Sequence, residues 1–218
     1  MATGRVGRCA VVTVKVFFEG GADPRSNPNA DTFDNTNRLR ESFNKLLNSD
    51  FDSEKVKIIA EPAFSIKSLV KIREIDSLLL MDLDALKDKR EQRIKDNQLT
   101  DIQDFVFFMI QRMESWILSQ PEIIEEVFAY YKSKLGLEND ASILNKHPET
   151  IINPDKVLDT IFQRYFSITK NGKTKKLKYG KLKHSPDLIE KLDLQKLRNA
   201  FEDVERMILK INQISSKS

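Results

Sequence analysis

The sequence predicts an α/β protein: a parallel sheet flanked by helices, followed by a helical C-terminal extension. Two observations predict this fold. Short apolar segments alternate with amphipathic segments over residues 1–130, as right-handed β-α-β crossovers require. Residues 77–81 are apolar throughout, as in a strand covered on both faces. Residues 131–218 change to helices around a lysine-rich loop, and we expect this extension to pack on the same domain.

The first half contains four predicted strands, which are short, rich in Val, Phe, Ile or Leu, and bounded by turn residues or charges. They span residues 9–18, 56–60, 77–81 and 105–110. Helices are predicted where apolar residues recur every three or four positions: 37–47 with Asn37 as N-cap, 66–72 and 113–128. Residues 22–37 have the composition of a loop, and the charged stretch 85–101 that of a solvated helix plus loop.

The second half has a helical pattern over residues 154–166 and again over 185–214, where one or two helices are expected. Between them, residues 169–184 are predicted to form a lysine-rich loop. Trp116 has the spacing of a core residue rather than of a base-stacking platform.

Composition excludes several classes of site. The chain has 218 residues with 36 Lys+Arg and 33 Asp+Glu, a formal charge of +3, so any phosphate affinity must come from local patches. One cysteine, Cys9, allows no internal disulfide, and with two histidines it cannot form a Cys/His zinc site. No segment approaches the roughly 20 apolar residues of a membrane span, and Lys15 interrupts the early apolar run. We therefore expect a cytoplasmic protein without a membrane partner.

Acidic residues follow two predicted strands. Glu19 ends the first strand, before Gly20 and Gly21, while Asp82 and Asp84 follow the third. The carboxyl ends of parallel strands share one edge of a sheet, and residues two apart on a strand share a face, so we expect the three carboxylates around one pocket. Such carboxylates require a cation, and their oxygen ligands suit Mg²⁺ or Mn²⁺. A solvated strand end is the commoner origin of a lone Asp-x-Asp.

This arrangement predicts phosphoryl or phosphodiester transfer, with the glycine pair letting a phosphate approach the backbone. Asp23 is interpreted either as a further contact of the site or as a turn-stabilising side chain. Gln111 and Glu114 follow the fourth strand at the same edge. Glu114 is interpreted as a second-metal ligand, as a partner of a basic residue, or as an acid stabilised by a helix N-terminus.

Lysines without an intervening acid define the loop at residues 169–184: Lys170, Lys173, Lys175, Lys176, Lys178, Lys181 and Lys183. With Tyr179 and His184 among them, this segment is expected to bind phosphates, chiefly through Lys178, Lys181, Lys183 and His184. Lys181 is the candidate for stabilising transition-state charge. The alternative is a solvated basic loop.

Two stretches resemble the Toprim motifs, in which a Glu follows strand one and an Asp-x-Asp follows strand three. Val-Lys-Val-Phe-Phe-Glu-Gly-Gly at 14–21 resembles the first and Leu-Leu-Leu-Met-Asp-Leu-Asp at 78–84 the second. More closely, the chain resembles small bacterial Toprim-like proteins catalogued as domain of unknown function 4276, related to Toprim/OLD-type nucleases. The stretches that carry this resemblance are 19–23, 40–47, 109–116 and 179–184. The chain departs from the usual pattern of this family at two places: Ala22 stands where a third Gly is usual, and residues 27–36 look like an insertion.

The resemblance implies a Toprim-type, metal-dependent nuclease acting on DNA or RNA. It implies Glu19, Asp82 and Asp84 as catalytic and metal-binding residues, and an ABC/AAA-type ATPase, encoded nearby, as partner in anti-phage defence. A homo-oligomer is also compatible. Two alternatives stay open. One is a non-catalytic module that docks the ATPase. The other is a haloacid-dehalogenase-type phosphatase with Asp82 as nucleophile, which leaves Glu19 unexplained.

Overall fold

A computed structural model describes residues 11–18, 30–62, 77–132, 134 and 136–217. Within them, a parallel sheet has the order β2-β1-β3-β4. Its strands are β1 (Val12–Phe18), β2 (Val56–Pro62), β3 (Ser77–Asp82) and β4 (Val106–Met109). The four predicted strands are confirmed, with shifted ends. Because the chain moves from β2 across β1 to β3, the strand order reverses between β1 and β3, which is where open α/β sheets bind ligands.

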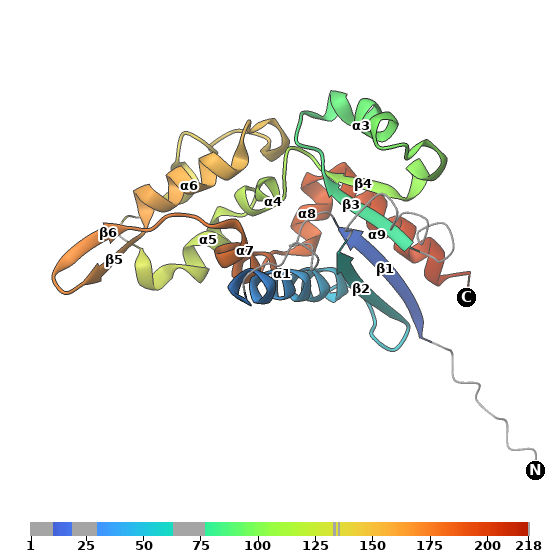
Figure 1. Ribbon diagram of the computed structural model, residues 1–218, viewed down its shortest axis with the longest axis horizontal. Coiled ribbons are helices and arrows are strands. Elements are labelled where there is room, and N and C mark those ends of the chain that lie inside the picture. Colours follow the sequence, from blue (N-terminus) through green and yellow to red (C-terminus); the bar gives the residue numbers. More distant parts are fainter. Residues whose placement is uncertain (1–10, 19–29, 63–76, 133, 135, 218) are drawn as a thin grey trace, which may run out of the picture.

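Both faces of the sheet are covered. Val16, Phe18 and Leu80 point to the face covered by α1 (Ala30–Asn48) and α9 (Glu202–Ser215). The alternate residues, including Phe17, Leu79 and Phe108, pack against the other cover. That cover consists of η3 (Lys87–Lys89), α3 (Arg90–Asp96) and η4 (Thr100–Phe105). The charged stretch predicted at 85–101 to hold a helix and loop contains η3 and α3, and η4 begins at its end. Figure 1 shows the sheet between these layers.

The segment between β4 and the hairpin is helical and irregular. Its elements are α4 (Glu114–Leu118), α5 (Pro121–Val127), η5 (Ala129–Tyr131), η6 (Leu137–Asn139), η7 (Pro148–Thr150) and α6 (Pro154–Tyr165). The single helix predicted at 113–128 is therefore wrong. It divides at Gln120, whose backbone lies at φ −133° and ψ 68°, and Pro121 starts the next helix at a position where its missing N–H costs nothing.

The loop predicted at residues 169–184 is also wrong. It contains an antiparallel hairpin, β5 (Ser167–Lys170) and β6 (Lys173–Lys176), and the start of α7 (Lys181–Ile189). Asn171 and Gly172 form the two-residue turn with φ of 53° and 70°. Asn-Gly favours this turn because both positions need a left-handed backbone. The hairpin projects at one end of the molecule (Figure 1).

Helix α1 begins at Ala30, earlier than predicted, so the predicted loop extends at most to residue 29. Asn37 lies inside the helix, where its side chain accepts a 2.6 Å hydrogen bond from Arg40 instead of capping the N-terminus. The helix predicted at 66–72 lies outside the described residues, as does Cys9.

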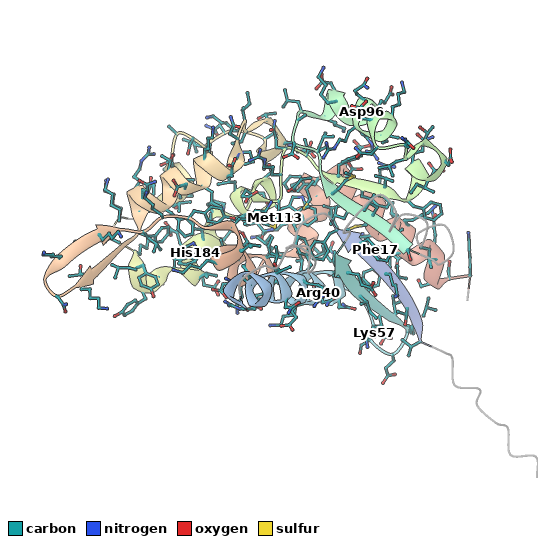
Figure 2. All side chains as sticks on the ribbon, viewed as in Figure 1. Phe17, Arg40, Lys57, Asp96, Met113 and His184 are labelled. Carbon is teal, nitrogen blue, oxygen red and sulfur yellow. The ribbon has the colours of Figure 1, made fainter. Side chains whose placement is uncertain are left out.

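Residues 131–218 take part in the main hydrophobic core. One cluster of buried side chains extends from Val14 in β1 to Ile214 in α9. Trp116, with no exposed surface, lies between Phe43 of α1 and Phe201, which precedes α9, with 6.2 Å between ring centroids on each side. Helix α7 packs on α1, and α8 (Leu194–Ala200) packs on α9. Figure 2 shows side chains filling the space between these layers.

No helix of the described part of the chain combines the length and the apolar composition needed to cross a membrane.

Candidate functional site

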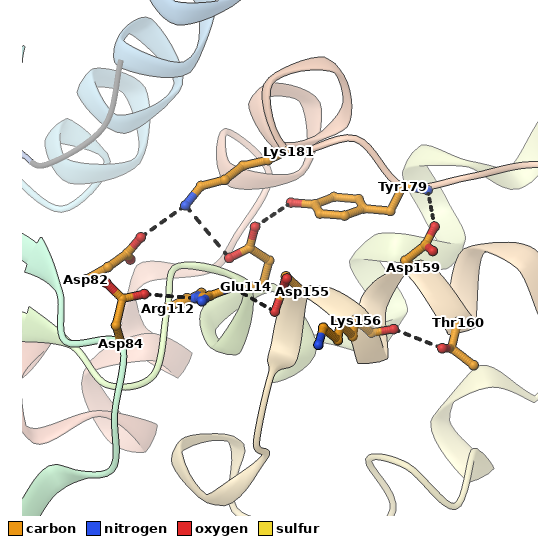
Figure 3. Close-up of a pocket in the computed structure, with 10 residues that line it drawn as sticks. All are labelled: Asp82, Asp84, Arg112, Glu114, Asp155, Lys156, Asp159, Thr160, Tyr179 and Lys181. Atoms are coloured by element: carbon orange, nitrogen blue, oxygen red, sulfur yellow. Dashed lines mark hydrogen bonds and ion pairs between the residues drawn. The ribbon is translucent and has the colours of Figure 1, made fainter. Parts of the chain in front are cut away.

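A cavity of about 560 Å³ opens beside the carboxyl end of β3, next to the point where the strand order reverses. Figure 3 shows the side chains that line it. They come from the ends of β3 and β4, from α6, and from the segment entering α7. The charged ones are Asp82, Asp84, Arg112, Glu114, Asp155, Lys156, Asp159 and Lys181.

Asp82 is the last residue of β3 and is only 9% exposed. It follows Leu78 and Leu80 on the sheet face covered by α1 and α9, and its side chain reaches the start of α4 and of α7. One carboxylate oxygen accepts a 2.9 Å hydrogen bond from the backbone N–H of Met113. The other lies 3.0 Å from Lys181 Nζ. Burial raises the pKa of Asp82, and the ammonium of Lys181 opposes that rise.

Glu114 begins α4 and has no exposed surface. Its Oε1 accepts a 3.1 Å hydrogen bond from the hydroxyl of Tyr179. Its Oε2 is 4.0 Å from Lys181 Nζ and has no hydrogen-bond partner in the described part of the chain. Burial raises the pKa of Glu114, opposed by the Lys181 ammonium, and Asp82 adds to the rise. A buried carboxylate oxygen without a partner costs free energy, which a bound cation or water would offset.

Lys181, the first residue of α7, places its ammonium between the carboxylates of Asp82 and Glu114 (Figure 3). Burial lowers the pKa of Lys181, but the two carboxylates outweigh burial and raise it above 10.5, so the side chain stays charged. Two backbone contacts hold the segment before it. The N–H of Tyr179 donates to Asp159 (2.9 Å), and the N–H of Gly180 donates to Nδ1 of His184 (2.9 Å).

Asp84 lines the same cavity but has other partners. Strand β3 ends at Asp82, and Asp84 has a left-handed backbone, φ 56°, so the alternation of side chains along a strand does not extend to it. Its carboxylate lies 2.9 Å from Arg112 Nε, and Arg112 Nη1 lies 3.0 Å from Asp155. The expectation that Asp82 and Asp84 point at one spot therefore needs correction, because Asp84 faces Arg112.

Gln111 contributes through its backbone. Its φ is 61°, its carbonyl accepts from the N–H of Asp84 (2.7 Å), and its own N–H donates to the carbonyl of Ala85 (3.0 Å). These bonds join the segments after β3 and β4 at the rim of the cavity. Asp84 and Gln111 are two of the six described non-glycine residues with positive φ, a backbone that costs energy outside glycine.

His184 is 6% exposed, with its ring 5.5 Å from Phe128 and 5.3 Å from Phe162. This burial argues against the predicted phosphate contact, and the imidazole supports Gly180 instead. Lys178 and Lys183 are exposed and lie outside the cavity.

Glu19, Gly20, Gly21 and Asp23 lie outside the described residues. Phe18, which immediately precedes Glu19, pairs in register with Leu80, two residues before Asp82.

Sequence reasoning missed Arg112 and the four polar residues of α6 that line the cavity: Asp155, Lys156, Asp159 and Thr160. Arg112 lies between Gln111 and Glu114, so its place at the end of β4 was a usable signal. Asp155 and Asp159 are four apart and share one face of α6, but only tertiary packing brings that face to the sheet.

No set of three Asp, Glu, His or Cys residues among those described is arranged to hold a metal ion. Asp82 and Glu114 supply hard oxygen donors, the class that Mg²⁺ and Mn²⁺ prefer, and one oxygen of Glu114 has no hydrogen-bond partner there. The donor chemistry therefore fits a divalent cation, with Lys181 between the same two carboxylates.

Comparison with curated proteins and with solved structures finds no match. One family model matches residues 27–212, which include β3, β4, the cavity and the hairpin. The chain belongs to the family described as Domain of unknown function (DUF4276).

Proposed function

We propose that this protein is a metal-dependent nuclease that hydrolyses phosphodiester bonds at the cavity beside β3. One observation carries the proposal. Two buried carboxylates, Asp82 and Glu114, face the ammonium of Lys181 at the point where the strand order of the sheet reverses. Their positions at the end of β3 and beyond β4, with β1 beside β3 leading into Glu19, support a Toprim-type site.

A bound Mg²⁺ or Mn²⁺ would supply Lewis-acid charge and an activated water at neutral pH. Asp82 and Glu114 are the described residues that would hold it, and Glu19 is proposed as a third ligand from its place in the sequence. Asp84 is proposed to hold Arg112 rather than the metal, because those two side chains are paired.

Other side chains are suited to the phosphate. Lys181 and Arg112 place positive charge at the cavity, where it stabilises charge that develops on phosphate oxygens. Glu114 Oε2, which has no hydrogen-bond partner in the described part of the chain, is the oxygen available to a metal. The hydroxyl of Tyr179 holds that carboxylate in position.

The proposal extends to an ABC/AAA-type ATPase partner and to a role in anti-phage defence. Both rest on the family resemblance alone.

The test is a calorimetric titration with Mg²⁺ and Mn²⁺, beside cleavage assays on plasmid, single-stranded DNA and tRNA. We expect wild type to bind metal and to cleave, and Asp82→Asn and Glu19→Gln to lose both. Asp88→Asn is the matched control, because Asp88 is an exposed acid on η3, away from the cavity.

Full cleavage by Asp82→Asn and Glu19→Gln would overturn the proposal. Metal binding without cleavage would indicate that the ATPase is needed, and co-expression with it should restore activity. Absence of metal binding would favour the non-catalytic module.

A further inference from the structure

The β5–β6 hairpin has two chemically different faces. Ile168 pairs with Lys175 and Lys170 with Lys173, so these four side chains share one face. Ser167, Thr169, Thr174 and Lys176 share the other. The first face continues into a hollow of about 470 Å³ that Lys178 and Lys183 also line. We call Lys170, Lys173, Lys175, Lys178 and Lys183 the basic face.

The basic face carries uncompensated charge. All five lysines are exposed, and none forms an ion pair with a described acid. Lys170 and Lys173 stand directly opposite each other across the strands, where like charges destabilise a hairpin. A polyanion bound on this face would relieve that repulsion.

The shape and composition of the hairpin select among polyanions. A two-stranded ribbon fits the major groove of B-form DNA, roughly 12 Å wide, whereas the major groove of duplex RNA is narrow and deep. Single strands are held mainly by aromatic side chains that stack on bases. The ribbon from Ser167 to Lys176 contains no aromatic residue.

We propose that the hairpin binds in the major groove of duplex DNA, with the lysines of the basic face on the flanking phosphates. Lys178 and Lys183 lie on either side of the segment that carries Lys181 to the cavity, so DNA held on this face leads toward Asp82. The inference deepens the proposed function by naming its substrate. It rests on that function only for the fate of the DNA, because binding requires no cleavage.

The test measures binding of the full chain by fluorescence anisotropy in EDTA, with duplex DNA, duplex RNA and single-stranded DNA of one sequence. We expect duplex DNA to bind most tightly. The triple variant Lys170→Gln/Lys173→Gln/Lys175→Gln should weaken binding about 100-fold near 0.1 M salt. It should also flatten the slope of log K against log salt by about 2.7, since each phosphate contact contributes roughly 0.9.

The matched control removes the same charge elsewhere. Lys57, Lys95 and Lys217 are exposed lysines away from the hairpin, and their triple Gln variant should bind like wild type. Circular dichroism verifies that both variants fold. Equal weakening by the two triple variants would overturn the inference, because it would show a response to net charge alone.

Tighter binding of single-stranded than of duplex DNA would also overturn the inference. A large loss of DNA affinity in Tyr130→Ala would overturn it as well. Tyr130 is 92% exposed and is the aromatic residue best placed to stack on a base.

Asp82→Asn separates this inference from the proposed function. Wild-type duplex binding by this variant, with neither metal binding nor cleavage by wild type, would contradict the nuclease and leave the DNA site standing. If wild type cleaves DNA but the triple variant of the hairpin binds duplex DNA like wild type, the nuclease stands and the DNA site on the hairpin is contradicted.

Discussion

The ammonium of Lys181 lies 3.0 Å from a carboxylate oxygen of Asp82, although 99 residues separate the two in the sequence. Asp82 is 12% exposed at its side chain and Lys181 41%, so water screens only one end of this pair. The same ammonium is the nearest positive charge to Glu114 Oε2, at 4.0 Å. Lys181 is therefore the counter-charge of two buried carboxylates, whatever chemistry the cavity performs.

Lys181→Met should destabilise the protein. Breaking a buried pair costs about 3–5 kcal/mol, and because the Lys181 side chain is 41% exposed we expect about 1–2 kcal/mol at neutral pH. Burial raises the pKa of both carboxyls, and loss of the ammonium raises them further. A carboxyl group whose pKa is raised on folding stabilises the folded state at low pH, and this contribution is lost as pH rises. The stability lost in Lys181→Met should therefore become smaller as the pH is lowered. Urea unfolding across pH measures this, and a deficit that does not change with pH would contradict it.

The control for that experiment is Lys183→Met. Lys183 lies two residues away, is exposed, and pairs with no acid in the described part of the chain. Its loss should leave stability near the wild-type value at every pH.

Tyr179→Phe keeps the ring but removes the hydroxyl that donates to Glu114 and bonds to Ser185. Because Glu114 is fully buried, leaving its Oε1 without this donor should cost about 1–3 kcal/mol. The pKa of Glu114 should rise further, so metal binding should require a higher pH than in wild type. Urea unfolding and calorimetry across pH measure the two effects. Tyr131→Phe is the control, and a variant equal to it in both readouts would refute the prediction.

His184 should make stability depend on pH. Burial lowers the pKa of His184 below 6.5, and its Nδ1 accepts a hydrogen bond from Gly180 that protonation would destroy. A lowered folded pKa stabilises the protein above 6.5, and that contribution is lost as pH falls through the folded pKa. His184→Asn retains an acceptor and does not titrate in this range. The stability of His184→Asn should therefore vary less than that of wild type between neutral pH and about pH 5. Thermal unfolding across this pH range measures the difference.

Asp140 should contribute stability far from the cavity. Burial alone would raise its pKa, but hydrogen bonds from Ser142 and Arg164 lower it to about 2. That contribution is present above 3.8 and is lost as pH falls toward about 2. Asp140→Asn should therefore cost about 1–2 kcal/mol at neutral pH and much less near pH 2. Guanidinium unfolding at both pH values tests this, and an equal cost at both would contradict it.

Gly172→Val should open the hairpin without unfolding the protein. A side chain at Gly172 would meet no atom within 4 Å, so the cost comes from φ 70°, a backbone that valine resists. The residues of β6 are all exposed, so global stability should change little. Duplex DNA binding should weaken. Wild-type affinity in this variant would show that the lysines bind without the ribbon.

The strand ends were the predictable part of the site. Apolar runs located β3 and β4. Asp82, which ends β3, and Glu114, which lies beyond the end of β4, line one cavity. Lys181 was identified within a lysine run by its resemblance to a family motif. Its role as counter-charge of two buried acids was visible only in the structure.

Other features depend on tertiary structure or on signals that were overlooked. The partner of Asp84 could not be predicted, because a left-handed backbone after β3 turns this residue toward Arg112. The hairpin could have been predicted from Asn171-Gly172. Ile168 is the one apolar residue in its two strands, so they lack the alternation that marks a half-buried strand.

The separation of Asp82 from Lys181 also sets when the cluster can close during biosynthesis. A ribosome adds about 5–20 residues per second, so the 99 residues between them take about 5–20 seconds to synthesise. During that time a nascent chain holds the acids without their ammonium, and α9, which covers one face of the sheet, has not been made. The cavity of the proposed nuclease therefore cannot be completed until Lys181 and the helices that follow it have been synthesised.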